Sequence, residues 1–448
     1  MKKYIILLSV CILIFVGLFA VTKVLDERAG VGSNTSAIAA GTSGDSTGND
    51  QSLLNSMQGQ GNSLEVSDEG TFIDNPEGTL VNQTADTVSA KLTAEDWQAR
   101  QSAGVTNSQI ALTMQKCSGM YAYDNLPAEQ KQLYAEILLI YQTLSKDVPL
   151  CSNEVAAVEK VSSCVLLDHP EIFYSDGYSY NQYMFVGTVQ KITYSPNYTL
   201  TREQIEERKA MVEQYATEFL KELPATATDY DKVKYVYEMV ILNTEYNLEA
   251  PDNQNICSVF LGRESVCLGY AKAVQYLLRQ VGVESVVVTG SVITGEAHAW
   301  NLVKVNGQYY YVDATWGDAS YMMDSGAGDA LATINYDYLN ITTQDISHTH
   351  IIDNPISVPN CMSQIDNYYV KEGLYLNSLD AQRMEEIFKT AYSTGQDCVS
   401  IRCSSPLVYG NFQKDMLDNQ QIFNYLGSGT TTLAYTSNDK LYTYTFML

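Results

Sequence analysis

Positive charge is scarce in this chain of 448 residues. It has 27 lysines and arginines against 52 aspartates and glutamates, a formal net charge of −25. Phosphate backbones would repel such a chain, so nucleic-acid binding is excluded as its function. Tryptophan is also scarce, with 3 residues against 33 tyrosines, which suits strand surfaces but indicates no function. The length allows two or three domains with buried cores, so disorder throughout is excluded.

Residues 4–22 contain no charged side chain, and Lys2 and Lys3 precede them. As a helix, this stretch would reach about 28 Å, close to the thickness of the hydrocarbon layer of a membrane. Cleavage of a signal requires small residues at two positions, and Leu18 before Ala20 spoils the obvious site. We therefore expect a signal anchor at 1–23, with a cleaved signal peptide as the alternative. The folded part is then extracytoplasmic, either anchored at the cell surface or secreted.

Lysine and arginine are absent between Arg28 and Lys91, where glycine, serine, threonine, asparagine and acidic residues dominate. Such sequence buries too little apolar surface to offset the entropy lost on ordering. We predict a disordered acidic linker over 24–92. A flexible coil of this length spans on the order of 45 Å, enough to hold a folded domain clear of a membrane.

From residue 93 onward, helical and alternating patterns are mixed, which predicts the α+β class. We expect an N-terminal α+β module at 93–224, a core at 225–357 and a C-terminal α+β module at 358–448. Helix starts with capping boxes are expected at Thr93 and Thr201. Apolar spacing predicts the remaining elements: helices over 127–146, 154–167, 231–243, 380–394 and 412–426, a strand over 183–194, and two final strands joined at 438–439.

Cys267 lies at the start of a predicted helix over 265–282, for which Gly282 is a natural stop. Backbone amides and the positive end of the helix dipole stabilise a thiolate at such a position. The alternative is a small buried cysteine that only packs under the helix.

Two strand patterns follow this helix, one over 285–289 and a longer hairpin over 297–316. Asn306 and Gly307 favour a two-residue turn, because both tolerate positive φ. The register then pairs residues across the hairpin: Val305 with Gln308, Trp300 with Asp313, and His298 with Thr315. His298 and Asp313 become diagonal neighbours on one face, at roughly 7–8 Å between backbones.

A thiol at a helix start, a histidine and an aspartate supply the parts of a thiol acyl-transfer site. His298 would take the proton of Cys267, the thiolate would attack an amide carbonyl, and Asp313 would hold the imidazole in its useful tautomer. This chemistry requires no cofactor and no metal. The alternative is a satisfied, half-buried strand histidine with Asp313 capping the strand end.

The segment from about 231 to 318 resembles the transglutaminase-like superfamily, whose active-site layout is related to that of papain-type enzymes. The matching motifs are VCLGYAKA around Cys267 and EAHAWNLVKVNGQYYYVDATWGD around His298 and Asp313. The flanks are similar to those of secreted bacterial members, chiefly of the Gram-positive type. The resemblance implies a core whose nucleophile-bearing helix packs on an antiparallel sheet.

By the same resemblance, Cys267 is the nucleophile, His298 the general base and Asp313 its orienting partner. The backbone amide of Cys267 is the expected oxyanion donor. The side chains of Trp300, Trp316 and Tyr270 are further candidates for the oxyanion site or the cleft.

The implied function is extracytoplasmic acyl transfer on a peptide or protein substrate. Family members cleave amides, cross-link proteins through glutamine and lysine, or have lost activity. We favour a cysteine peptidase or amidase-type hydrolase, because the chain has no recognisable animal-type cross-linking domains. A cross-linking transglutaminase is one alternative, and a non-catalytic surface protein that retains the triad is another. Residues 4–22 would contact the membrane.

Other candidate residues receive structural interpretations. His348 and His350 would share a face on a strand, but no ligand set accompanies them, and the resemblance places only His350 near the cleft. His169 is expected to cap or pack, and Cys257 is a disulfide partner, a regulator or a packing residue. An odd number of cysteines remains after Cys11 and Cys267, which argues against a complete disulfide framework.

Overall fold

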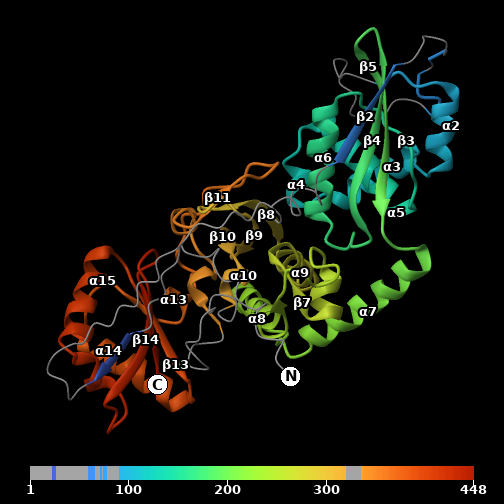
Figure 1. The fold of residues 1–448 in the computed structure, drawn as a ribbon. Coiled ribbons are helices and arrows are strands. Elements are labelled where there is room, and N and C mark those ends of the chain that lie inside the picture. The colour runs from blue at the N-terminus through green and yellow to red at the C-terminus, as the bar shows by residue number, and fades with distance from the viewer. Residues whose placement is uncertain (1–22, 27–58, 66–70, 73, 78–89, 319–333) are drawn as a thin grey trace, which may run out of the picture.

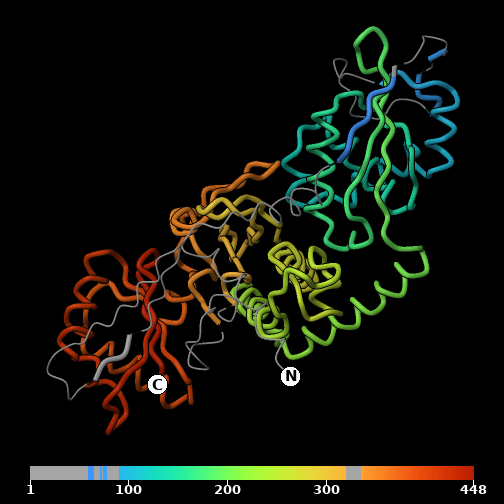
Figure 2. Tube along the Cα trace, viewed as in Figure 1, coloured from blue at the N-terminus to red at the C-terminus, as the bar shows by residue number. Residues whose placement is uncertain are grey.

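The structure, a computed structural model, describes residues 23–26, 59–65, 71–72, 74–77, 90–318 and 334–448. They form three parts that follow one another along the length of the molecule (Figure 1). Figure 2 traces the same course from blue through green and yellow to red. Residues 1–22 of the expected signal anchor lie outside the described residues. Within the described residues, no helix has both the length and the apolar character needed to cross a membrane.

The first part packs helices against a four-stranded sheet of order β2-β4-β5-β3. Its elements, in chain order, are β2 (Gly59–Glu65), α2 (Ala94–Ser102), α3 (Asn107–Cys117), α4 (Tyr121–Asp124), α5 (Ala128–Thr143), β3 (Val148–Pro149), α6 (Val155–Asp168), β4 (Ser175–Phe185) and β5 (Thr188–Tyr198). The capping box at Thr93 is confirmed, since its side chain accepts from the backbone amide of Asp96 and its own backbone amide donates to the Asp96 carboxylate. The predicted helices over 127–146 and 154–167 are confirmed as α5 and α6.

The predicted single strand over 183–194 is wrong, because this region is a hairpin. β4 and β5 pair antiparallel and turn at Val186 and Gly187. Val186 has a φ of 51° and Gly187 a φ of 73°. A β-branched residue rarely takes positive φ, so valine gives no turn signal in the sequence.

The segment predicted to be a linker contains β2 and all of β1 (Lys23–Asp26) except Lys23. β2 pairs parallel with β4, and β1 pairs antiparallel with a strand of the third part. Gly59 lies against the ring of Tyr178, where an added Cβ would come within 2.0 Å of a ring carbon. The glycine therefore lets this strand approach the tyrosine ring closely.

The second part carries a helix on a four-stranded antiparallel sheet of order β10-β9-β8-β11. Its elements are α7 (Arg202–Leu220), α8 (Asp229–Leu242), β6 (Glu245–Tyr246), the π-helix η1 (Ser258–Gly262), β7 (Glu264–Ser265), α9 (Cys267–Gln280), β8 (Ser285–Val292), β9 (Ala297–Val305), β10 (Gln308–Val312), α10 (Ala314–Gly317), η2 (Tyr336–Tyr338), α12 (Thr343–Ile346) and β11 (His350–Ile352). The capping box at Thr201 is confirmed at the start of α7. The α+β class is likewise confirmed, with α9 as the helix that carries Cys267.

The third part surrounds a five-stranded sheet of order β1-β14-β15-β13-β12. Its elements are α13 (Tyr368–Lys371), β12 (Tyr375–Leu376), α14 (Ala381–Thr394), β13 (Cys398–Cys403), α15 (Pro406–Phe412), η3 (Gln413–Asp418), η4 (Gln421–Tyr425), β14 (Thr432–Asn438) and β15 (Thr443–Met447). The predicted helix over 412–426 is wrong as one element. The chain breaks at Gln420, whose φ of 56° cannot continue a right-handed helix.

Candidate active site

Cys267 is the first residue of α9, and the chain before it is held in place. The Ser265 hydroxyl lies 2.9 Å from the carbonyl oxygen of Asn253 and 2.6 Å from the Ser258 hydroxyl. A Cβ on Gly269 would lie 2.0 Å from the oxygen of Ser265, so only glycine fits under this turn. The helix start is therefore fixed, and Cys267 is 5% exposed.

Two buried amide side chains tie α9 to its neighbours. Asn301 on β9 donates to the carbonyl oxygen of Ala271 at 2.9 Å. Gln275 donates to the carbonyl oxygens of Leu167, at 2.8 Å, and Ser285, at 3.2 Å. These bonds fix the position of Cys267 relative to the strand that carries His298.

The hairpin register is confirmed along its paired length. Val305 pairs with Gln308, and the ladder runs to Asn301 opposite Val312. The predicted pairings of Trp300 with Asp313 and of His298 with Thr315 are wrong, because the ladder ends at Val312 and the chain then begins α10. In the sheet, His298 pairs instead with Gly290 on β8.

Asp313 stands where the strand ends and caps the short helix α10. Its Oδ1 accepts from the backbone amides of Thr315, at 2.9 Å, and Trp316, at 3.2 Å. The cap turns the carboxylate so that its other oxygen faces the sheet. Proximity to His298 thus comes from a strand followed by a helix cap, not from a continuous ladder.

The structure brings Cys267, His298 and Asp313 together. Nε2 of His298 lies 2.7 Å from Oδ2 of Asp313. The Cys267 thiol lies close enough to the His298 ring to raise the pKa of the imidazole. Because Nε2 faces the carboxylate, Nδ1 is the nitrogen left for the thiol.

The charges of these groups are coupled. Burial lowers the pKa of His298, but the Asp313 carboxylate and the Cys267 thiol outweigh burial and raise the pKa to about 10. Burial likewise acts to raise the pKa of Asp313, yet its histidine partners hold that pKa well below its usual range. An imidazolium beside an ionised Asp313 is therefore the favoured state of this pair at neutral pH.

We expect the charge on His298 to stabilise the fold most at acidic and neutral pH. The pKa of histidine is ~6.5 in an unfolded chain and about 10 for His298 in the fold. Its contribution is therefore complete below about pH 6.5 and is lost as the pH rises towards about 10. The melting temperature of the wild type should exceed that of His298→Gln by an amount that shrinks across this range. A difference independent of pH would contradict a charged His298.

The aromatic cleft candidates occupy different environments. Trp300 and Trp316 flank the His298 ring, with ring centroids at 5.9 and 6.0 Å. Both indole nitrogens are buried and have no hydrogen-bond partner among the described residues. Tyr270 lies under α9 instead, where its hydroxyl contacts the Thr244 carbonyl at 3.0 Å and is fully buried. Tyr270 therefore supports the helix rather than lining the cleft.

A second histidine contacts the same carboxylate. Nε2 of His350 lies 3.0 Å from Oδ2 of Asp313. The expectation that His348 shares the face of His350 on a strand is wrong. The capping box of Thr342 begins helix α12, and His348 falls in the turn after it, before β11 starts at His350. The spacing of residues in the sequence did not predict the contact between His350 and Asp313. Only the family resemblance had placed His350 near the cleft.

Among the described residues, one group of potential metal ligands is close enough to hold an ion, formed by His298, Asp313 and His350 within 4.8 Å. Both histidine nitrogens already point at one carboxylate oxygen, at 2.7 and 3.0 Å. These are ordinary hydrogen-bond distances, and the oxygen takes the place between the nitrogens that an ion would need. The arrangement fits a hydrogen-bonded site better than a metal centre.

The other candidates lie outside this site. Cys257 is buried next to Arg208, and burial raises its pKa to about 12. The cysteines of the described residues are all free thiols, including Cys398 and Cys403 on β13. Nδ1 of His169 lies 2.6 Å from a Glu171 carboxylate oxygen at the end of α6, which agrees with the predicted capping or packing role.

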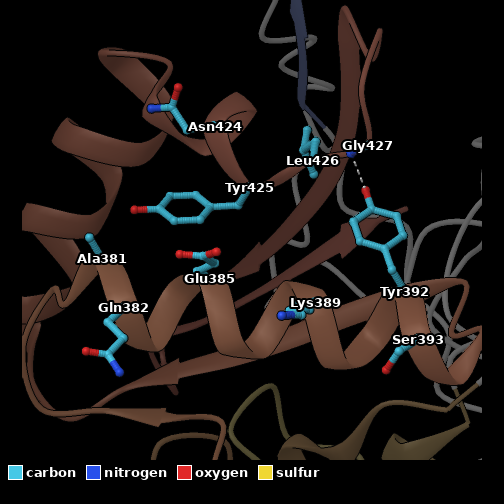
Figure 3. A pocket seen from close by; sticks show the side chains of 10 residues that line it. All are labelled: Ala381, Gln382, Glu385, Lys389, Tyr392, Ser393, Asn424, Tyr425, Leu426 and Gly427. Carbon is cyan, nitrogen blue, oxygen red and sulfur yellow. Dashed lines mark hydrogen bonds between the residues drawn. The ribbon is translucent and has the colours of Figure 1, made fainter.

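A surface hollow of ≈ 850 Å³ lies in the third part. Figure 3 shows Glu385 and Lys389 on α14 and, above them, Tyr425 and the bond from the Gly427 amide to the Tyr392 hydroxyl. No cysteine or histidine lines this hollow.

Comparison with known families agrees with this geometry. Residues 217–314 match the family model described as Transglutaminase-like superfamily. The core of this chain is transglutaminase-like. Cys267, His298 and Asp313 all lie within the matched residues. The Gram-positive surface type remains a prediction.

Two curated relatives match part of this chain. Kyphoscoliosis peptidase of Mus musculus and that of Homo sapiens are each 24% identical over 204 residues, 41% of this chain. The match spans only 30% of the length of either relative.

Solved structures match more weakly. A crystal structure of a TGase matches with 14% identity and a TM-score of 0.24, over 36% of this chain and 57% of that chain. A Cytophaga hutchinsonii protein, named as a proposed cysteine protease, matches with 15% identity and a TM-score of 0.22, over 31% of this chain and 62% of that chain. TM-scores this low say nothing further about function.

Proposed function

We propose that this chain is a thiol acyl-transfer enzyme that acts on peptide or amide bonds. One observation carries the proposal: the His298 ring interacts with the Cys267 thiol, and its Nε2 lies 2.7 Å from Oδ2 of Asp313. A base between a nucleophile and an orienting carboxylate is the arrangement that thiol acyl transfer requires. The position of Cys267 at the start of α9 adds stabilisation of a thiolate by the helix dipole.

In the proposed reaction, His298 already holds the thiol proton as an imidazolium, and the Cys267 thiolate attacks the amide carbonyl. The backbone amide of Cys267 donates to the oxygen that becomes negative. His298 then returns the proton to the leaving amine, which departs as the carbon–nitrogen bond breaks and a thioester remains. Water resolves the thioester in a hydrolase, and a second amine resolves it in a cross-linking enzyme. We favour hydrolysis, on the analogy drawn from the sequence.

We also propose that the reaction takes place outside the cytoplasm on a peptide or protein substrate. The uncharged stretch over 4–22 after Lys2 and Lys3 supports this location.

Alkylation of Cys267 tests the proposed site without knowledge of the substrate. In the full-length protein, iodoacetamide should label Cys267 rapidly at pH 7, because an adjacent imidazolium favours the thiolate. His298→Ala should slow this labelling roughly 10- to 30-fold, because a free thiol is only a few per cent ionised at pH 7. Mass spectrometry would report each cysteine separately.

Two controls accompany this measurement. Cys257 in the same sample is a buried thiol with no histidine partner given by the structure, and His169→Ala removes a buried histidine outside the site. Labelling of Cys267 at the rate of Cys257, indifferent to His298, would favour a binding protein that merely retains the triad. Casein cleavage and incorporation of a fluorescent amine into casein would then separate hydrolysis from cross-linking.

A further inference from the structure

The feature that the triad leaves unexplained is the second imidazole on Asp313. His350 and His298 each direct Nε2 at the same oxygen, Oδ2 of Asp313, at 3.0 and 2.7 Å. An ionised carboxylate only accepts hydrogen bonds, so each histidine carries its proton on Nε2. Asp313 therefore accepts four hydrogen bonds, two backbone amides on Oδ1 and two imidazoles on Oδ2.

The remaining nitrogen of His350 also has a partner. Nδ1 lies 2.7 Å from the Thr349 hydroxyl oxygen. Burial lowers the pKa of His350 below its ordinary value, and the charge on His298 lowers it further. The hydrogen bond to Asp313 raises this pKa but does not outweigh burial. His350 is thus neutral at pH 7. With its proton on Nε2, its Nδ1 accepts the hydrogen bond that the Thr349 hydroxyl donates.

The His350 ring is immobilised and shielded from solvent. Its side chain is 0% exposed. The rings of Trp316, Trp300 and Tyr338 pack around it, with centroids at 4.7, 4.9 and 5.9 Å. A ring enclosed in this way does not touch a substrate, so its effect must pass through Asp313.

The fold brings His350 to this place through β11. His350 pairs with Val292 on β8, and Ile352 pairs with Gly290. A Cβ on Gly290 would lie 2.0 Å from the carbonyl oxygen of Ile351 and 2.9 Å from the ring of Trp300. Glycine at this position therefore allows β11 to approach the site as closely as it does.

We propose that His350 is a positioning residue, which holds Oδ2 of Asp313 in the direction of His298. This inference rests on the proposed function. The cap of α10 fixes one carboxylate oxygen, and His350 fixes the other, so the carboxylate cannot rotate away from the imidazole. His298 then keeps the orientation in which Nδ1 faces Cys267.

Two substitutions separate positioning from packing. His350→Leu fills the space but donates no hydrogen bond, whereas His350→Gln retains an N–H near the position of Nε2. We expect His350→Leu to lower kcat and the alkylation rate of Cys267 roughly 10- to 100-fold with KM unchanged, as is typical when an orienting partner is lost. His350→Gln should restore most of both rates. His169→Leu, the same loss at a buried histidine bonded to a carboxylate elsewhere, should leave the alkylation rate unchanged.

Several results would overturn the proposal. Alkylation of His350→Leu at the wild-type rate, with the same pH profile, would show that His350 does not act on His298. Equal losses in the Leu and Gln variants, with a parallel fall in melting temperature, would show a packing role. If His350→Leu does not fold, Thr349→Val is the deciding variant. It removes the hydroxyl that lies 2.7 Å from Nδ1 of His350, together with the longer contact of that hydroxyl, at 3.3 Å, with the carbonyl oxygen of Ile346. It should still slow alkylation of Cys267. Failure of the proposed function itself is seen separately, as slow labelling in the wild type that His298→Ala does not change.

Discussion

Replacement of Asp313 by asparagine is expected to lower kcat about 10⁴-fold, the loss seen when a triad carboxylate becomes an amide. The carboxylate accepts hydrogen bonds on both oxygens, from the α10 amides of Thr315 and Trp316 and from the two imidazoles. An amide side chain has one oxygen, so it can accept hydrogen bonds either from the two backbone amides or from the two imidazoles, but not from both pairs. If the oxygen remains on the helix cap, the NH₂ group faces His298 and forces its proton onto Nδ1. That tautomer cannot accept the proton of Cys267.

The measurement is turnover in whichever of casein cleavage and amine incorporation the wild type catalyses. Asp366→Asn is a matched control, because Asp366 is a buried carboxylate whose oxygen lies 3.1 Å from Nζ of Lys371, outside the site. The control variant should keep its activity. If Asp313→Asn retained more than a tenth of the wild-type kcat, Asp313 would not be the partner that sets the His298 tautomer.

Replacement of Glu136 by alanine is expected to destabilise the first part of the chain by about 3–5 kcal/mol, the usual cost of leaving a buried charge unpaired. Nη2 of Arg100 on α2 lies 3.0 Å from Oε1 of Glu136 on α5, and the two side chains are 1% and 0% exposed. Burial opposes both charges, yet the pair keeps the pKa of Arg100 raised and that of Glu136 lowered. Without Glu136, the Arg100 charge would retain the carbonyl oxygen of Pro149 as a partner but lose its counter-charge.

Urea unfolding followed by circular dichroism would measure this loss. Glu206→Ala serves as the control, because Glu206 and Lys209 form an exposed pair on α7, with side chains 66% and 39% exposed. Exposed pairs contribute about 0–1 kcal/mol, so the control should unfold near the wild-type midpoint. A similar small change in Glu136→Ala would mean that water reaches Arg100 in the folded chain.

Much of the second part was predictable, because its signals are local. The turn at Asn306 and Gly307 set the hairpin register, since both residues tolerate positive φ. The apolar period before Gly282 placed Cys267 at a helix start. These patterns depend on neighbours in sequence, which is why the positions of Cys267 and His298 could be read without a structure.

The rest depended on contacts that sequence spacing does not carry. Val186 turns a hairpin at positive φ although valine disfavours it, so tertiary packing decides that turn. Asp313 ends a strand and caps a helix at once, a double role that alternation cannot reveal. His350 meets Asp313 only because Gly290 lets β11 approach β8, and no local pattern encodes that approach.

The strand β11 also determines how much of the chain would be needed to transplant this chemistry into another scaffold. A shortened protein that stops after α10 would contain the thiol, the imidazole and the carboxylate. It would lack β11, and β8 would then become the outer strand of its sheet with unpaired backbone groups along 290–292. Such an open strand invites pairing with other chains and aggregation. A grafted site therefore has to include β11, the outer strand of the sheet. Without β11, the transplanted protein would lose both its solubility and the geometry of the site.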